Sequence, residues 1–297
     1  MAYLRGNHMR KKRTALLLLL PFLAITALVL AAAAIVLVQS LGYIPVFGLT
    51  DLTTQYYEKI LHSSDFLQSL AVSLYLALVS ATVAAVLGVV IAAALVTLRR
   101  QNSAALQIIR LPILVPHMVV AVFVVTLFSQ TGLLSRLCCT AGLISDPAQF
   151  PQLLYTESFA GVILAYLWKE IPFVAYFVLA LMASVKDTLG QAAENLGASP
   201  LRSFFHVTLP LTMPAVLNAY LIIFIFAFGG YELPALLGPT LPKALPIRAY
   251  LEFSSPDLLH RPYAMAANAV ILMISCVMAL LYFLFTRRLV KKLGGER

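Results

Sequence analysis

The sequence predicts an all-α membrane protein with six transmembrane helices, and three observations support this class. First, 61% of the 297 residues are hydrophobic and only 11% are charged, whereas soluble domains have about 25% charged residues. Second, the apolar residues fall into runs long enough to cross a bilayer, which takes about 20 residues in a helix. Third, basic residues cluster beside these runs. Because a chain in lipid must satisfy its own backbone hydrogen bonds, we expect the runs to be helices.

The six expected spans cover approximately residues 14–41, 69–98, 108–128, 158–185, 209–228 and 264–285. The first span follows the basic tetrapeptide at 10–13, as the apolar core of a signal peptide would. A cleavable core is only about 7–15 residues long, so we interpret this longer run as an uncleaved span. The third span is expected to contain Pro112 and Pro116 in its first turns.

The basic residues are unequally divided between the two sides that six spans define. Of the 21 lysines and arginines, Lys169 lies within a span, and one side holds only Lys59, Arg136, Lys243, Arg248 and Arg261. The other side holds the remaining fifteen and both termini, and the positive-inside rule makes it cytoplasmic. We therefore expect a multi-pass protein of the bacterial cell (inner) membrane. It would have a basic N-terminus at 1–13, a six-helix domain at 14–288 and a C-terminal tail at 289–297.

The expected outer side is rich in acidic residues. It contains Asp51, Glu58, Asp65, Asp146, Glu157, Glu232, Glu252 and Asp257. This excess of acids over bases would favour the approach of cations. Loop solubility alone is an equally good explanation, and both interpretations stay open.

Several kinds of chemistry find no support in the sequence. Its three cysteines have no metal-binding spacing, and the adjacent Cys138 and Cys139 are either ordinary thiols or a strained vicinal disulfide. None of the eight lysines follows a glycine, so the Gly-Lys of a P-loop is missing and the chain is not expected to hydrolyse ATP itself. No HExxH or GxSxG motif indicates an enzyme. The basic clusters border apolar runs, so nucleic acid is not an expected partner.

The segment between the fourth and fifth spans is amphipathic and interrupted by turns. Asp187 is positioned to cap a helix that runs through residues 191–194. Gly197 is positioned to end that helix in a left-handed conformation. Ser199 and Pro200 have the pattern of an N-cap and the first residue of a second helix. The sequence therefore predicts a cytoplasmic helix–turn–helix, within a loop at about 186–210, between helices 4 and 5.

This loop resembles the EAA loop of the permease subunits of binding-protein-dependent ABC importers. In that family an EAA motif is followed by LG and, further on, by LP. The matching residues are Gln191, Ala192, Ala193, Leu196, Gly197, Ala198, Phe204, Leu209 and Pro210. Gln191, in place of the usual Glu, is the clear departure. The resemblance implies that these residues couple the chain to a separate ATPase subunit.

The resemblance also implies a set of partners. These are two copies of a cytoplasmic ABC ATPase, which would bind the ATP and Mg, a second permease subunit, an external substrate-binding protein and membrane lipid. No cofactor is expected in this chain. Residues 160–275, including the WKEIPF stretch at 168–173, further resemble permeases of the spermidine/putrescine importer branch. This implies a polyamine or similar organic cation as the solute. Thiamine, ferric iron and aminoethylphosphonate are the alternatives within the branch.

Two charged residues lie deep in the fourth span and are candidates for the substrate path. A charge at such depth costs at least about 2.5–3.5 kcal/mol on insertion scales. Glu170, together with Trp168 and its neighbours, would therefore line a wet translocation path. The alternative is a structural ion pair that holds helices together. His117, in the third span, is interpreted either as a proton relay or as a hydrogen-bonded packing residue.

The second candidate region follows the fifth span. The pair Gly229-Gly230 is expected to break the helix near its outer end, and broken helices are tolerated where they line a cavity. Glu232, together with Tyr231 and Trp168, would hold an ammonium group there by charge and cation–π contact. The alternative is a loop anchored by interfacial aromatic side chains.

The sequence thus predicts a permease that moves solute without chemistry of its own. A secondary transporter or channel is the alternative from another class. It would show inverted repeats and discontinuous helices in matching positions of the two halves, which are not evident in the sequence.

Overall fold

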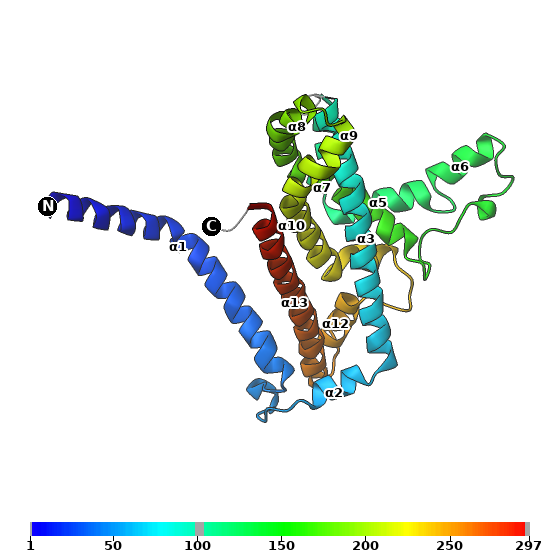
Figure 1. Ribbon diagram of the computed structural model, residues 1–297. Helices are drawn as coiled ribbons and strands as arrows, with labels where there is room; N and C mark the ends of the chain where they lie inside the picture. The colour runs from blue at the N-terminus through cyan, green and yellow to red at the C-terminus, as the bar shows by residue number, and fades with distance from the viewer. Residues whose placement is uncertain (1, 99–103, 295–297) are drawn as a thin grey trace.

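The computed structural model describes residues 2–98 and 104–294, and within these the chain is helical without β-strands. The long helices are α1 (Ala2–Ser40), α3 (Ser64–Thr97), α7 (Ala160–Val185), α10 (Leu209–Phe228) and α13 (Arg261–Gly294). Shorter helices connect them: α2 (Gln55–Leu61), α4 (Ala104–Leu114), α5 (His117–Phe128), α6 (Leu133–Thr140), α8 (Gln191–Asn195), α9 (Pro200–Ser203), α11 (Glu232–Leu237) and α12 (Leu245–Phe253). Figure 1 shows their arrangement.

Six helical segments of the described chain are long and apolar enough to cross a membrane. They are Leu17–Ser40, Ser64–Thr97, His117–Thr140, Ala160–Asn195, Pro200–Phe228 and Leu258–Lys291. The predicted number of spans is therefore confirmed by length and composition. The basic pair Arg99 and Arg100, used in the charge count, lies outside the described residues.

The third span differs from its prediction. Instead of one helix with prolines in its first turns, α4 ends at Leu114 and α5 begins at His117. Pro116 has an extended backbone (φ −60°, ψ 148°), and a proline also pushes the residue before it out of the helical region. The chain is therefore interrupted at Val115–Pro116, and the apolar segment continues to Thr140.

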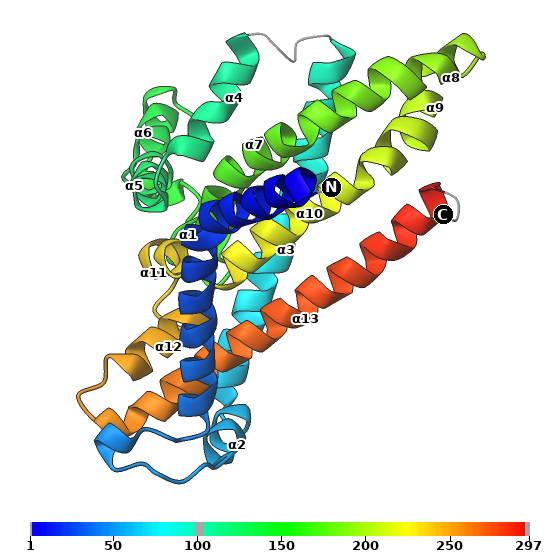
Figure 2. The same cartoon turned by 90° about the vertical axis from the view of Figure 1, so that its left-hand side faces the viewer.

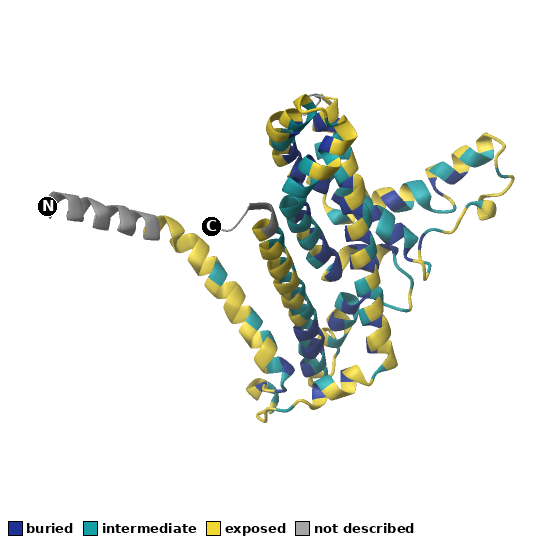
Figure 3. Cartoon of the chain, in the orientation of Figure 1, coloured by how far each residue is buried: buried dark blue, intermediate teal, exposed yellow. Residues whose placement is uncertain are grey.

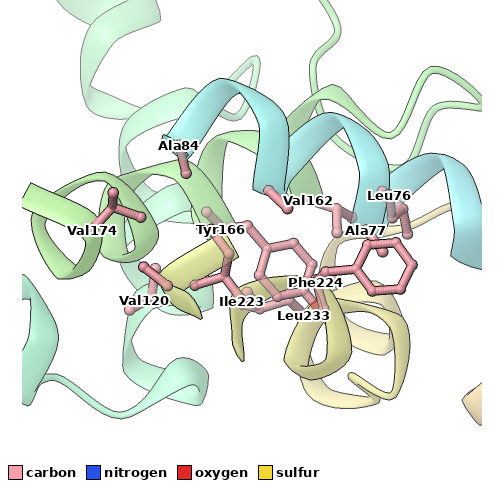
Figure 4. Packing of buried hydrophobic residues seen from close by; sticks show 14 of the residues in the cluster. Leu76, Ala77, Ala84, Val120, Val162, Tyr166, Val174, Ile223, Phe224 and Leu233 are labelled. Carbon is pink, nitrogen blue, oxygen red and sulfur yellow. The ribbon is translucent and has the colours of Figure 1, made fainter. Parts of the chain in front are cut away.

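The core lies between α3, α7 and α10. Small residues allow close approach: the Cβ of an alanine at position 88 of α3 would come within 2.6 Å of the Val174 Cβ on α7. Figure 4 shows Tyr166 of α7 in this cluster, together with Ala84 of α3 and Ile223 of α10. Shape-matched packing of this kind is the main attraction between helices in lipid, where no hydrophobic driving force remains.

The two ends of the helical bundle have different character. Figures 1 and 2 place α8 and α9 at one end of the molecule and α2 and α12 at the opposite end. At the α2 end, a second cluster packs Phe66 against Leu245 and Ala266. The Ser73 hydroxyl accepts a hydrogen bond of 2.8 Å from the Leu245 amide, which ties α12 to α3.

The first span is nearly uncovered by the rest of the chain. None of its most apolar 18 residues is buried, and Figure 3 shows it as an exposed helix that diverges from α13. So much apolar surface is compatible only with lipid or another chain as its surroundings.

Candidate functional site

A break between α10 and α11 forms the centre of the candidate site. Helix α10 ends at Phe228, and the short helix α11 begins at Glu232. Gly230 lies in the break, and a Cβ at this position would collide with the Tyr166 hydroxyl and approach the Phe226 carbonyl oxygen to 3.2 Å. The missing side chain therefore lets the Tyr166 hydroxyl lie directly against the backbone of the break. The predicted end of the helix at the two glycines is confirmed.

The break opens into a cavity of about 590 Å³ between α5, α7, α10 and α11. This volume is within the usual range of small-molecule sites, about 300–1,000 Å³. Its lining residues come from all four helices: His117, Tyr166, Ile225, Phe226, Gly229, Gly230, Tyr231, Glu232 and Leu233. Glu232 is the acidic member of this set.

The side chain of Lys169 is hydrogen-bonded to the backbone at the helix break at Val115–Pro116. Its Nζ donates a hydrogen bond of 2.6 Å to the Val115 carbonyl oxygen. That carbonyl has lost its helical donor, because the amides of Val119 and Val120 both bond to Pro116 instead. The same Nζ lies 3.3 Å from His117 Nδ1. Lys169 thus joins α7 to the start of α5, beside the cavity.

His117 serves as part of the cavity wall. Its ring packs against the ring of Phe226, with 4.8 Å between the centroids and 31° between the planes. Of the two interpretations drawn from the sequence, this geometry shows a packed and hydrogen-bonded histidine.

Glu170 is buried beside the cavity without a partner. Its side chain is 5% exposed, and neither carboxylate oxygen has a hydrogen-bond partner among the described residues. Neither Glu170 nor Lys169 is in an ion pair among the described residues. The structural ion pair between helices that the sequence left as an alternative is therefore not observed there, and Lys169 links α7 to the start of α5 by a hydrogen bond to the Val115 carbonyl instead.

The four predicted path residues therefore divide into two pairs. Tyr231 and Glu232 line the cavity, whereas Trp168 and Glu170 do not. Trp168 is 41% exposed and packs edge-on against Phe123, with ring centroids 6.4 Å apart. It lies outside the cation–π grouping proposed with Glu232.

Sequence reasoning did not select Tyr166 and Phe226, and it assigned no cavity role to His117. Tyr166 is one helical turn before Glu170 and on the same face of α7. This spacing from a predicted path residue could have identified it as a candidate. Phe226 had no signal, because its apolar neighbours in α10 look alike.

The loop between α7 and α10 forms two helical arms joined by a tight turn. A π-helical turn (Lys186–Gly190) connects α7 to α8 without interruption, and a second one (Phe204–Thr208) connects α9 to α10. Gly197 has the left-handed φ of +94°, and Ser199 caps α9 by accepting a hydrogen bond of 3.3 Å from the Arg202 amide. Both local predictions are confirmed, whereas the cytoplasmic position of the loop stays a prediction.

Asp187 does not cap α8, contrary to the prediction. Helical geometry continues through Gly190, and the Gln191 amide bonds to the Lys186 carbonyl. Because the preceding turn supplies acceptors, α8 needs no side-chain cap.

Polar contacts stabilise this loop within and between its two arms. The Ser203 hydroxyl donates a hydrogen bond of 2.9 Å to the Gly190 carbonyl and so joins the arms, whereas the ion pair between Lys186 and Glu194 lies within the first arm. The apolar side chains of Leu196 and Leu201 are 89% and 72% exposed at the tip. This loop, residues 186–210, is called the coupling loop below.

The fold and the cavity define a class: a multi-pass helical membrane protein with an internal site beside a broken helix. Residues 84–293 match the family described as "Binding-protein-dependent transport system inner membrane component". The chain belongs to this family, as the resemblance of the coupling loop implied.

Curated relatives agree with the family. The chain is 26% identical over 168 residues to the spermidine/putrescine transport system permease protein PotB of Escherichia coli (strain K12), covering 57% of this chain and 58% of that protein. It is 26% identical over 223 residues to the putrescine transport system permease protein PotI of the same organism, covering 74% of this chain and 72% of that protein.

Solved structures share the fold. A chain of a bacterial ABC transporter involved in the import of the acidic polysaccharide alginate has a TM-score of 0.68, with 20% identity, over 91% of this chain and 97% of that one. A chain of the bacterial alginate ABC transporter in complex with an alginate pentasaccharide-bound periplasmic protein has a TM-score of 0.64, also with 20% identity, over 93% of this chain and 97% of that one.

Proposed function

We propose that this chain is the permease subunit of an ATP-driven importer whose cargo is a small organic cation of the polyamine type. The cavity at the α10–α11 break carries the cargo proposal, because Glu232 is the acidic residue in its lining, beside Tyr166 and Tyr231. A carboxylate in a partly dehydrated cavity attracts an ammonium group more strongly than one in bulk water does. Aromatic faces add cation–π attraction. The names of the two polyamine permease relatives support the same cargo class.

The proposed transport cycle needs partners on both sides of the membrane. An external binding protein delivers the cation, and two cytoplasmic ATPase subunits dock on the coupling loop, where Leu196 and Leu201 offer exposed apolar surface. A second permease subunit completes the pathway. ATP binding shifts the pair between two conformations that differ in their affinity for the partners and the cargo. In this chain, residues bind and release the cargo and make no covalent bond to it.

Removing the charge of Glu232 tests the cargo proposal. Glu232→Gln keeps the shape of the side chain, and we expect ATP-dependent uptake of radiolabelled 1,4-diaminobutane at sub-saturating concentration to fall about tenfold or more, because hydrogen bonds to charged groups contribute about 1.5–3 kcal/mol. Glu157→Gln is the matched control, since that carboxylate is exposed in a loop outside the cavity.

The measurement uses proteoliposomes that contain the assembled transporter, with equal amounts of each variant. Uptake by Glu232→Gln at the level of the Glu157→Gln control would contradict a cation site at the α10–α11 break. Capture of an anion by the external protein encoded with this chain would contradict the cargo class while leaving the permease assignment in place.

A further inference from the structure

Glu170 is a buried carboxylate that the cavity alone does not explain. It is 5% exposed, with both oxygens unpartnered among the described residues. Unpartnered buried polar atoms are rare in native proteins, and an acidic group inside a membrane span is expensive unless it has a function or a partner. The nearest lysine in the sequence, Lys169, is engaged with the Val115 carbonyl.

Tyr166 separates this carboxylate from the cavity. Residues 166 and 170 are four apart on α7 and therefore neighbours on one helix face, with about 5–6 Å between their Cβ atoms. The Tyr166 hydroxyl lies at the cavity, against Gly230. Tyr166 and Glu232 line the cavity, and the turn of α7 that follows Tyr166 carries Glu170.

A second unpartnered polar atom lies nearby on α3. The Ser80 hydroxyl is fully buried and has no hydrogen-bond partner among the described residues. Position 88 packs against Val174, and α3 and α7 run in the same direction (Figure 1). Ser80 precedes position 88 by the same eight residues by which Tyr166 precedes Val174, so it lies at about the level of Tyr166.

We propose that Glu232 and Glu170 form a two-point site for a diamine, with Tyr166 between them as a movable partition. One ammonium group binds Glu232 in the cavity. When the Tyr166 ring turns aside, the second ammonium binds Glu170, with the Ser80 hydroxyl as a further acceptor. This inference rests on the proposed function and adds to it a requirement for two positive charges in the cargo.

The diamine site predicts a preference that a single carboxylate cannot produce. A monoamine has one ammonium and uses Glu232 alone, whereas a diamine neutralises both carboxylates at once. Because the two ends are linked, the second contact forms at a high effective concentration. The preference for a diamine over a monoamine of equal carbon number is therefore the measure of Glu170 engagement.

Binding of 1,4-diaminobutane and n-butylamine to the purified, fully assembled transporter tests the proposal by titration calorimetry. We expect the wild type to bind the diamine about tenfold or more tightly, since each charge-assisted contact contributes about 1.5–3 kcal/mol. Glu170→Gln should abolish this preference and leave the n-butylamine affinity unchanged. Glu232→Gln should weaken both ligands.

The outcomes distinguish failure of the Glu232 cation site from failure of the two-point diamine site. If Glu232→Gln changes neither affinity, the cation site of the proposed function fails. If Glu232→Gln weakens both ligands but Glu170→Gln keeps the diamine preference, or lowers both affinities equally, the two-point inference is overturned. Should Glu170→Gln not assemble, Glu170→Asp keeps the charge on a shorter side chain. It should shift the preference from 1,4-diaminobutane to 1,5-diaminopentane, and an unshifted preference would contradict the inference.

Discussion

Two adjacent residues, Lys169 and Glu170, have opposite environments. The ammonium of Lys169 reaches across to α5 and donates to a carbonyl that Pro116 leaves without a helical partner. The carboxylate of Glu170 is buried, and neither of its oxygens has a hydrogen-bond partner among the described residues. Lysine has a long, flexible stem that can carry its charge to an acceptor, whereas glutamate is shorter and stays near its own helix. Neighbouring charges in a sequence therefore need not form a pair.

Gly197 is the residue of the coupling loop whose backbone geometry is most demanding. Its φ of +94° is unfavourable for L side chains, and nothing lies within 4 Å of the position that a Cβ would occupy. The requirement is therefore conformational and not steric. Asparagine tolerates left-handed geometry better than other residues, and β-branched residues tolerate it poorly.

Substitution at Gly197 should weaken the link between cargo delivery and ATP hydrolysis. The loss should be larger for residues that tolerate the left-handed backbone of this position less well. We expect Gly197→Val to lose most of the ATPase stimulation by cargo-loaded binding protein, because the turn between α8 and α9 rearranges. Gly197→Asn, the matched control, should keep most of it. ATPase activity of the reconstituted complex, with assembly checked by gel filtration, is the measurement. Equal stimulation in the Val variant and the wild type would show that the turn does not transmit the signal.

At the scale of helices, the sequence predicts the apolar segments well and their interruptions less well. Hydrophobic runs identify six spans because lipid imposes one length requirement on every helix. The break between α10 and α11 was predictable from paired glycines. The break at Val115–Pro116 was not predicted, and these residues were placed inside one continuous helix. A proline near a helix start is compatible with a continuous helix and with an interrupted one. The contact that favours the interruption comes from Lys169 on another helix.

The candidate site was predictable only in part, for a related reason. Glu232 and Tyr231 stand out in the sequence because they follow a helix break. Tyr166 and Phe226 lie in regular helices, and only the packing of α5, α7 and α10 brings them to the cavity. Trp168 was misplaced beside Glu232, since its orientation depends on the rotation of α7, which a sequence without a dominant apolar face leaves undetermined.

The close approach of α3 and α7 gives a prediction for these two helices. Gly88→Ala would place a Cβ within 2.6 Å of Val174 Cβ and 3.0 Å of the Ala175 amide nitrogen. Overpacking of this kind typically destabilises by about 1–3 kcal/mol. Thermal unfolding of the purified permease in detergent should show a lower midpoint. Val90→Leu, which enlarges an exposed side chain of the same helix, should leave the midpoint unchanged, and equal midpoints for both variants would contradict this packing.

At the scale of the molecule, the distribution of charge predicts an orientation. With both termini cytoplasmic, the α8–α9 end faces the cytoplasm, and the α2–α12 end faces outward. Single cysteines at the exposed positions Asn195 and Thr240 sample the two sides. The background lacks Cys138, Cys139 and Cys276, which are free thiols in the structure.

An impermeant thiol reagent applied to intact spheroplasts should label Thr240→Cys and not Asn195→Cys. Disruption of the membrane should then expose Asn195→Cys to the reagent. Labelling of Asn195→Cys alone in intact spheroplasts would reverse the orientation, and labelling of both positions would exclude the six-span topology.

ATP-driven uptake tests the central claim most directly. The chain is reconstituted in proteoliposomes with the ATPase, permease and binding-protein subunits encoded beside it, and internal radiolabelled 1,4-diaminobutane is measured over time. We expect accumulation above the external concentration only with ATP and the binding protein, and none with an ATPase subunit that lacks its P-loop lysine. Accumulation that continues without ATP hydrolysis, driven by an ion gradient alone, would identify a secondary transporter and contradict the account.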